Sequence, residues 1–508
     1  MTVTPDKFLI KVLTPVHIGC DEVYEPMSFV VDAEHDRMIL FDPLDFIISL
    51  EEADRKRISE ICRQGTVGSI LELYKFLRGR PAQGRDVALC SGFVQHYGQA
   101  LEIPLSDEAR IGRELNEFSI ARTAFLSYDQ RPYLPGSGIK GAMRTAYLNA
   151  LATGANIRID VRRPGADREL EERLLQLDRG FRGIVQDPFR LLKISDFVPV
   201  GEVKTRIVYA VNEKKVPSSF EPSGPYQVLE VVEPGAEFTG TIRLEMAERG
   251  SPIKSPLRIQ PLLDSLHQFF RKQKALEDDQ LRKIGVGLEN RNAVNGSHLL
   301  RIGRHSGAEC VTVEGYRNIR IMQPGTTNAR WSASATTLWL AAESRKPMSK
   351  SGLQPFGWVA LVPLKEDQER RMEEIERDRR AERELRERIR LDDLRQRIEA
   401  AQETAKRSAQ EAEWQRIEER CIKAKKAQQQ ADLASMTKTE QAVALIQSAD
   451  VTENEVVAIY QKIDEFETNE AVAAALKDYW IRAGKWKKKE CSPKQLKKVA
   501  KVKEILGE

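Results

Sequence analysis

Short runs of branched and aromatic residues, separated by polar turns, mark the first part of the chain. Phe8–Leu13, Phe29–Asp32 and Met38–Phe41 have the composition of β-strands. Ile70–Arg78 instead spaces its apolar residues three and four apart, which predicts a helix. The same mixture continues with strands predicted at 203–211, 226–232 and 237–245 and an amphipathic helix at 261–275. The pattern predicts an α+β fold with helical insertions such as 50–125.

Two segments depart from this pattern. Arg158–Arg190 is charged and broken by proline and glycine, so we expect a surface loop or hairpin. From Lys365 the composition changes abruptly, and residues 366–399 are dominated by Arg and Glu pairs four residues apart. Their apolar seam is thin, so a solvated single helix is preferred to a coiled coil. Continued to residue 430, it would be about 100 Å long.

Composition and charge exclude several classes of protein. The chain has 508 residues, more than one ordinary domain. No apolar run approaches the ~20 residues of a membrane helix, and the N-terminus lacks a secretion signal. The six cysteines form no Cys-x-x-Cys pair, so we expect no zinc site and no disulfide framework. We expect a reducing cytoplasm, no membrane and no cofactor.

The net charge of +4 conceals a basic C-terminus. Residues 477–508 carry eleven Lys and Arg against four acids, a balance of +7. Aromatic and basic residues are interleaved there, which could hold single-stranded RNA by stacking and phosphate attraction, although a basic, solvated helix end is the preferred interpretation. The residues are Trp480, Arg482, Lys485, Trp486, Lys487, Lys488 and Lys489.

The most specific motif is the stretch 133–145, which reads as a turn leading into a helix. Pro135, Gly136, Ser137 and Gly138 form the turn, and Lys140 and Arg144 follow four residues apart on one helix face. Helix-start N–H groups beside two cations suit a phosphate backbone. A second glycine-containing loop follows at Arg301-Ile-Gly-Arg-His305, where Arg301, Arg304 and His305 are candidate phosphate contacts.

These stretches resemble the signature of the RAMP superfamily, the RNA-binding subunits of CRISPR effector complexes. Gly138 stands where the family usually has a second serine. The order and spacing of the motifs are most similar to the RAMP subunit that caps the crRNA 3′ end in type III-A (Csm) complexes. The resemblance extends to about Pro363. It rests on 8–20 with Tyr24, Pro26 and 29–32, and on 133–145, 187–196, 300–307 and 355–359.

The resemblance implies a modified ferredoxin-like (RRM-like) fold and a non-enzymatic role in crRNA binding, crRNA maturation and antiviral defence. The partners it implies are crRNA, target RNA, neighbouring RAMP subunits and host nucleases. The RNA-binding residues expected are Lys140, Arg144, Ser137, Gly138, Arg301, Arg304 and His305. The domains expected are 1–200 and 201–364 (the two RAMP regions), 365–434 (the charged helix) and 435–508 (a basic, all-α module).

Two other functions remain open. A metal-independent crRNA-processing endoribonuclease would use His17 as its acid or base, since histidine titrates near neutral pH. The simpler interpretation is that His17 fills a turn and hydrogen-bonds the backbone. Asp36 and Asp129 could serve a nuclease as well, but neither lies in a recognisable motif. An adaptor would use the charged helix to present the C-terminal module to a partner.

Overall fold

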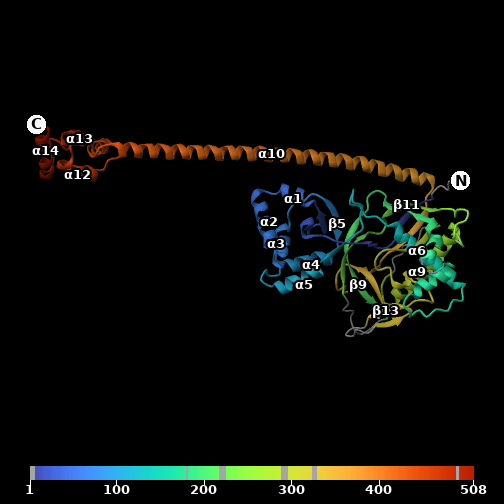
Figure 1. Cartoon of the computed structure of the whole chain (residues 1–508). Helices are drawn as coiled ribbons and strands as arrows, with labels where there is room; N and C mark the ends of the chain where they lie inside the picture. Colours follow the sequence, from blue (N-terminus) through green and yellow to red (C-terminus); the bar gives the residue numbers. More distant parts are fainter. Residues whose placement is uncertain (1–5, 179–180, 217–224, 288–295, 323–328, 488–490) are drawn as a thin grey trace. The chain divides into compact units, whose positions relative to one another are not determined.

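The computed structural model describes residues 6–178, 181–216, 225–287, 296–322, 329–487 and 491–508. The contacts divide the chain into two compact units, Met1–Arg388 and Ile389–Glu508. Helix α10 (Glu366–Ser435) begins in the first unit and continues into the second (Figure 1). Within the described residues, none of the helices combines the length and the apolar character that a bilayer crossing requires.

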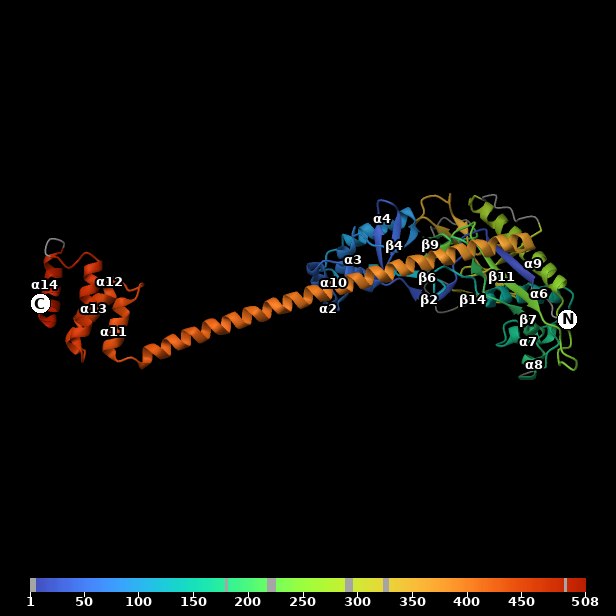
Figure 2. The ribbon, with the colours of Figure 1, turned by 90° about the horizontal axis from the view of Figure 1, so that it is seen from above.

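The first sheet of the larger unit is antiparallel and carries two helices on one face. Its strand order is β12 (His298–Arg301), β17 (Trp358–Pro363), β1 (Asp6–Val12), β11 (Glu237–Leu244) and β7 (Leu192–Ile194), with β8 (Val198–Pro199) also paired to β11. Helices α6 (Gly136–Thr153) and α9 (Ile259–Lys283) lie beside each other near β11 in both views (Figures 1 and 2). Their apolar faces bury Met143 and Phe270 with Ile10, Phe238 and Trp358 of the sheet. Because β1 and β7 both pair antiparallel with β11, they run parallel to each other on either side of it.

The second sheet is mixed and carries the helical insertion. Its strand order is β2 (Gly19–Val23), β6 (Ile120–Thr123), β10 (Gln227–Val232), β9 (Thr205–Lys214), β5 (Arg85–Leu89), β4 (Arg37–Leu40) and β3 (Phe29–Asp32), while β15 (Thr337–Ala342) pairs with β9 and β16 (Gln354–Pro355). The insertion supplies α1 (Pro43–Ser49), α2 (Glu52–Gln64), α3 (Val67–Leu77), α4 (Ser91–Leu101) and α5 (Glu108–Glu117). Phe93 and Leu71 of these helices pack against Met38 and Tyr209 of the sheet. The chain therefore combines two curled sheets with many helices, as an α+β fold.

The segment 158–190 contains two α-helices, and the prediction of a loop or hairpin is wrong where they lie, whereas residues 158–165 before them form neither helix nor strand. Helix α7 (Ala166–Leu174) buries Ala166, Leu170 and Leu174, which lie four residues apart on one face. Helix α8 (Phe181–Gln186) follows. The high charge of the exposed face concealed this sparse apolar stripe. A two-stranded hairpin, β13 (Ile319–Met322) and β14 (Ala329–Ser332), completes the larger unit.

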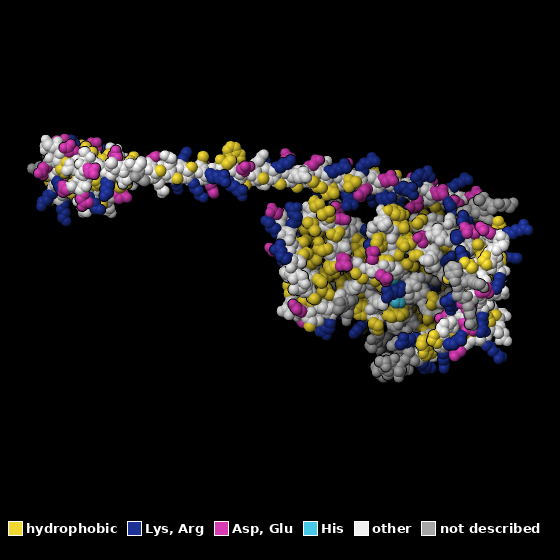
Figure 3. All heavy atoms as spheres, in the orientation of Figure 1, with side chains coloured by type: hydrophobic (Ala, Val, Ile, Leu, Met, Phe, Trp, Pro, Cys, Tyr) yellow, Lys and Arg dark blue, Asp and Glu magenta, His cyan; other side chains and the backbone are white. Residues whose placement is uncertain are grey.

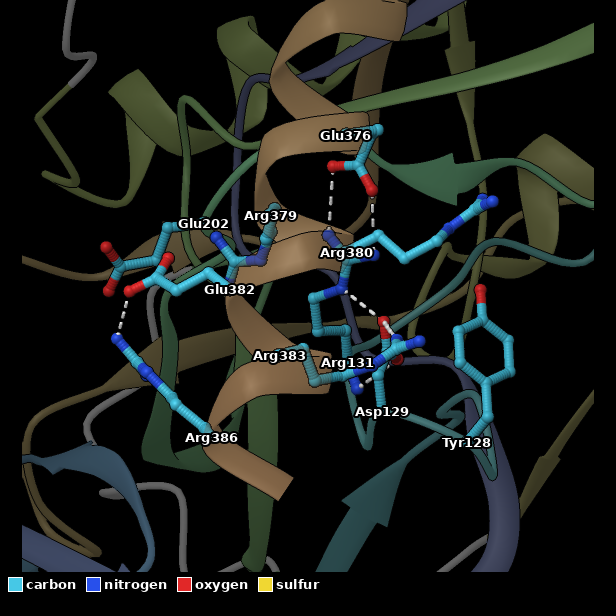
Figure 4. Close-up of a pocket in the computed structure, with 10 residues that line it drawn as sticks. All are labelled: Tyr128, Asp129, Arg131, Glu202, Glu376, Arg379, Arg380, Glu382, Arg383 and Arg386. Atoms are coloured by element: carbon cyan, nitrogen blue, oxygen red, sulfur yellow. Dashed lines mark hydrogen bonds and ion pairs between the residues drawn. The ribbon is translucent and has the colours of Figure 1, made fainter. Parts of the chain in front are cut away.

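The first turns of α10 dock on the body, although the sequence predicted a solvated helix. Glu376 accepts hydrogen bonds from Arg131 Nη1 and Nη2 at 3.0 and 2.9 Å (Figure 4). It also accepts from the Gly201 N–H at 2.7 Å. Arg383 lies 3.5 Å from Asp129 Oδ2, and Lys7 pairs with Glu369 and with Glu373. Arginines and acids around these contacts line a cavity of about 580 Å³. Further along, cationic and acidic side chains are interspersed on the surface of α10 (Figure 3).

The second unit contains four further helices with a core of their own. They are α11 (Lys438–Gln447), α12 (Glu453–Gln461), α13 (Asn469–Arg482) and α14 (Pro493–Leu506). Capping boxes at Thr437 and Thr452 begin the first two. Trp480 is 2% exposed within this core, so its ring is not available to stack on a base. Trp486 is half-buried between the ammonium groups of Lys477 and Lys503. Lys488 and Lys489 lie outside the described residues.

Candidate nucleic-acid interface

The turn before α6 is held by the segment that follows it in the sheet. A Cβ on Gly136 would lie 2.5 Å from the carbonyl oxygen of Ser195 and 2.6 Å from that of Ile194, so only glycine fits there. The Gly136 N–H donates to Asp196 Oδ1 at 2.8 Å. A carboxylate of this chain thus already occupies the anion position at the helix start.

The two predicted phosphate-binding cations of α6 also have partners within the protein. Lys140 Nζ donates to the carbonyl oxygen of Leu192 at 2.8 Å, and burial lowers the pKa of its ammonium group. Arg144 is paired with Asp187 at 2.8 Å and with Glu171 at 2.7 Å, and its guanidinium lies over the ring of Phe189. Both side chains therefore brace α6 against the 187–196 segment.

The stretches 133–145 and 187–196 consequently form one interlocked cluster. The sequence predicted phosphate contacts for Lys140 and Arg144; in the structure Lys140 donates to a backbone carbonyl and Arg144 is paired with two carboxylates. Ser137 and Gly138 are exposed on the first turn of α6. Pro135, at the N-cap position, provides no side-chain cap, and the Asp196 carboxylate caps the helix start instead. Asp196 belongs to the 187–196 stretch, but nothing in the sequence indicated that it would accept a hydrogen bond from the Gly136 N–H.

A second cluster joins the N-terminal, 301–307 and 355–359 stretches. Gly303 has a φ of 83°, and a Cβ there would lie 2.5 Å from the carbonyl oxygen of His17. Gly357, with a φ of 88°, packs equally closely on the carbonyl oxygen of Ile302. The Arg304 N–H donates to His17 O at 2.8 Å, and the Gly357 N–H donates to Pro15 O at 2.9 Å. Glycine is required at both positions because an L side chain would meet backbone oxygen in a left-handed conformation.

The three candidate residues of this loop have different positions. The Arg301 side chain is 4% exposed, forms an ion pair with Glu277 at 2.7 Å and donates to Phe356 O at 2.7 Å. The structure therefore corrects the proposed phosphate contact of Arg301, because its guanidinium is buried inside the protein. Arg304 is exposed, and within the described residues its guanidinium has no carboxylate partner.

His305 lies between these two arginines with its ring partly buried. It stacks on Trp339 with ring centroids 4.6 Å apart, and its Nε2 lies 3.1 Å from Gln227 Oε1. Burial, followed by the charges of Arg304, His17 and Arg301, lowers the pKa of His305 to about 4. The imidazole is thus neutral at physiological pH and offers no charge to a phosphate. Nothing in the sequence indicated its contact with Trp339.

His17 is fully buried at the junction of the two sheets. Its Nδ1 donates to the carbonyl oxygen of Glu230 at 2.8 Å, and burial lowers the pKa of the ring. The carboxylate of Glu230 accepts from Arg85 at 2.9 Å and from the hydroxyl of Tyr24 at 2.8 Å. His17 therefore supports the turn through the backbone, which is the simpler of the two interpretations of the sequence.

The two acidic candidates have different surroundings. The Asp129 carboxylate, 4% exposed, pairs with Arg131 at 2.6 Å and with Arg383. Asp36 has a φ of 48° in the turn between β3 and β4. Among the described residues, no three His, Cys, Asp or Glu side chains come together in a way that could hold a metal ion.

The interlocked motifs coincide with the region that matches a known family. The model of the RAMP superfamily matches residues 9–290, more than half of the chain. The chain belongs to the RAMP superfamily. Gly136 and His17 lie within the matched region of this RAMP protein, whereas the 301–307 and 355–359 stretches lie after it.

A curated relative of this RAMP protein comes from Methanocaldococcus jannaschii. It is the CRISPR system Cms protein Csm5, 26% identical over 209 residues. The match covers 38% of this chain and 43% of the relative, so the chain spans less than half of that protein's length.

Two solved structures are similar at low sequence identity. The cryo-EM structure of a Csm–crRNA–target RNA ternary complex of a type III-A CRISPR-Cas system contains a chain 20% identical, with a TM-score of 0.40, covering 70% of this RAMP protein and 100% of that chain. The crystal structure of T. onnurineus Csm5 is 18% identical, with a TM-score of 0.38 and coverages of 69% and 99%.

Proposed function

We propose that this RAMP protein is a Csm5-like, RNA-binding subunit of a type III-A CRISPR ribonucleoprotein that caps the crRNA on its 3′ side. The family and the Csm5 relative support the type of complex. In this proposal the first sheet, with α6 and α9 on one face, is the modified ferredoxin-like unit. The partners are crRNA, target RNA and neighbouring Csm subunits.

The observation that carries the RNA-binding role is the position of Arg304. Three separate stretches of the chain build the loop that holds it, through the close contacts of Gly303 and Gly357. The loop's other arginine, Arg301, is used inside the protein to fix the backbone. Arg304 is left at the surface with its charge uncompensated by an ion pair among the described residues, as a phosphate contact requires.

The endoribonuclease alternative receives less support. An acid or base must reach the 2′-hydroxyl within hydrogen-bond distance. His17 is 0% exposed, so it cannot reach an RNA without opening both sheets. The adaptor alternative is favoured by one observation, the separate core of α11–α14, and it is compatible with RNA binding by the larger unit.

Reconstitution of the complex with and without this chain tests the proposal. We expect the purified chain to bind crRNA without cleaving it in metal-free buffer, and the assembled complex to protect a 3′-end label from exonuclease digestion. Complexes that lack the chain should lose that protection. Equal protection with and without the chain would contradict the capping role, and cleavage abolished by His17→Ala would favour the endoribonuclease.

A further inference from the structure

A second cavity, of about 300 Å³, lies beside the 301–307 loop. Gln273, Leu276, Glu277 and Gln280 line it from one face of α9, at the helical spacing of i, i+3, i+4 and i+7. The loop, the segment that follows it and the start of β15 form the facing walls. This volume is at the lower end of the range of about 300–1,000 Å³ that is usual for small-ligand sites. The residues of these facing walls include Arg301, His305, Glu309, Arg317, Thr337 and Trp339.

The charges on the wall of this cavity are largely compensated. Arg301 is paired with Glu277 at 2.7 Å, and Lys215 is paired with Glu309 at 2.6 Å. Arg317 Nη2 donates to the carbonyl oxygen of Glu309 at 3.0 Å. A phosphate, which carries a full negative charge, would find one excess cation here. The wall suits a neutral polar group better.

Two hydrogen-bond donors remain unused on this wall. Gln273 is 4% exposed, and within the described residues its Nε2 has no hydrogen-bond partner. In the same part of the chain, the Nε of Arg317 is buried without a partner. Native proteins satisfy nearly all buried polar atoms, so each exception requires an explanation. Both residues line the cavity, so a ligand there should present acceptor atoms to their side chains.

The aromatic wall indicates the shape of that ligand. Trp339 and His305 are stacked at an interplanar angle of 27° and lie at the side of the cavity nearest the loop. Leu276 adds an apolar side chain that is 47% exposed. A flat, neutral group with acceptors along its edge matches an aromatic wall with two buried donors, and nucleobases have this combination of features.

We propose that this cavity receives one unstacked nucleobase of a single-stranded RNA, with Gln273 and Arg317 donating to acceptor atoms on the edge of the base. The proposal rests on the RNA-binding function proposed above. Arg304 would contact the RNA backbone, and the cavity would add a contact to a base. This part of the protein would then distinguish one nucleotide position from its neighbours.

Abasic scanning of the RNA tests the proposal with the full-length chain. A short single-stranded RNA of mixed sequence is compared with a series in which each nucleotide in turn lacks its base. With the wild-type protein, affinity should fall by about 3- to 10-fold at one position, as expected for one or two lost hydrogen bonds. In Gln273→Met, which keeps the shape but lacks the donor, intact RNA should bind correspondingly less well and the fall at that position should largely disappear.

Gln268→Met is the matched control, because Gln268 is exposed on the same helix and does not line the cavity. It should reproduce the wild-type abasic profile. A flat profile in the wild type, or the same profile in Gln273→Met, overturns the base pocket while leaving RNA binding intact. If the wild-type protein shows no RNA binding at all, both proposals are overturned. Melting curves of the free proteins show whether Gln273→Met is folded, and we expect it to be at least as stable as wild type because it removes an unpaired buried donor.

Discussion

The amide nitrogen of Gly136 lies 2.8 Å from Oδ1 of Asp196, at the start of helix α6. This contact places a carboxylate where the sequence suggested a phosphate, and it depends on the absence of a side chain at position 136. The turn that most clearly identifies the family is therefore closed by the protein itself, and the exposed Arg304 of another loop becomes the better candidate for a phosphate contact.

Gly136→Ala should destabilise the larger unit. The new Cβ would lie 2.5 Å from Ser195 O, so backbone must shift, at a cost of about 1–3 kcal/mol or more. Gly141→Ala is the control in the same helix, since a Cβ there meets nothing within 4 Å. It should raise stability by about 1 kcal/mol through helix propensity. Thermal unfolding of the two variants should shift in opposite directions, and equal midpoints would refute the role of the close approach.

Arg304→Ala should weaken RNA binding without lowering the unfolding temperature, since its side chain is exposed. The slope of log affinity against log salt should decrease by about 0.7 for one lost phosphate contact on a single strand. Arg304→Lys should retain most of that slope. Arg301→Ala should instead leave the buried charge of Glu277 without its ion-pair partner, which costs about 3–5 kcal/mol of stability. An Arg304→Ala protein with unchanged affinity and slope would remove this residue from the interface.

Glu376→Gln should loosen the first turns of α10. It removes the charge that accepts from Arg131 and from the Gly201 N–H. A hydrogen bond to a charged group contributes about 1.5–3 kcal/mol, so amide-exchange protection in 368–386 should fall by roughly tenfold or more. Glu374→Gln, which changes an exposed neighbour on the same helix, should leave protection unaltered. Identical exchange in both variants would mean that other contacts hold the helix.

His305 should make the larger unit less stable as the pH falls. Its pKa is about 4 in the folded protein, below the usual 6.5, so the unfolded chain binds the proton first. The contribution to stability is complete above pH 6.5 and declines between pH 6.5 and pH 4, by up to about 3 kcal/mol. His305→Asn should flatten that part of the stability curve, since asparagine tolerates the left-handed φ of 63°.

Local pattern was sufficient for most elements of the fold. The strand predicted at 29–32 has those bounds in the structure, and the strand predicted at 237–245 spans Glu237–Leu244. The helix predicted at 261–275 is longer, Ile259–Lys283, because charged residues follow its apolar start. Helix α7 was missed for the same reason: its apolar residues are few and its exposed face is charged.

For the candidate site, the sequence predicted which segments take part but not how their side chains pair. Composition and spacing identified the glycines and cations, but not which cations would face carboxylates from distant stretches. Arg144 and Asp187 are 43 positions apart, and Arg131 and Glu376 are 245 apart. Such pairs depend on how the chain folds back on itself, and a charged residue looks the same in the sequence whether its partner is solvent or another side chain.

The closeness of Gly136, Gly303 and Gly357 to carbonyl oxygens affects how relatives of this chain should be sought. A search built on these glycine-containing stretches selects for polypeptides that can close the same backbone crossings. It would find descendants that keep the architecture after losing their nucleic-acid contact as readily as those that retain it. Retention of the arginine after Gly303 and of the glutamine on α9 would be the more direct criterion for sorting such relatives by activity.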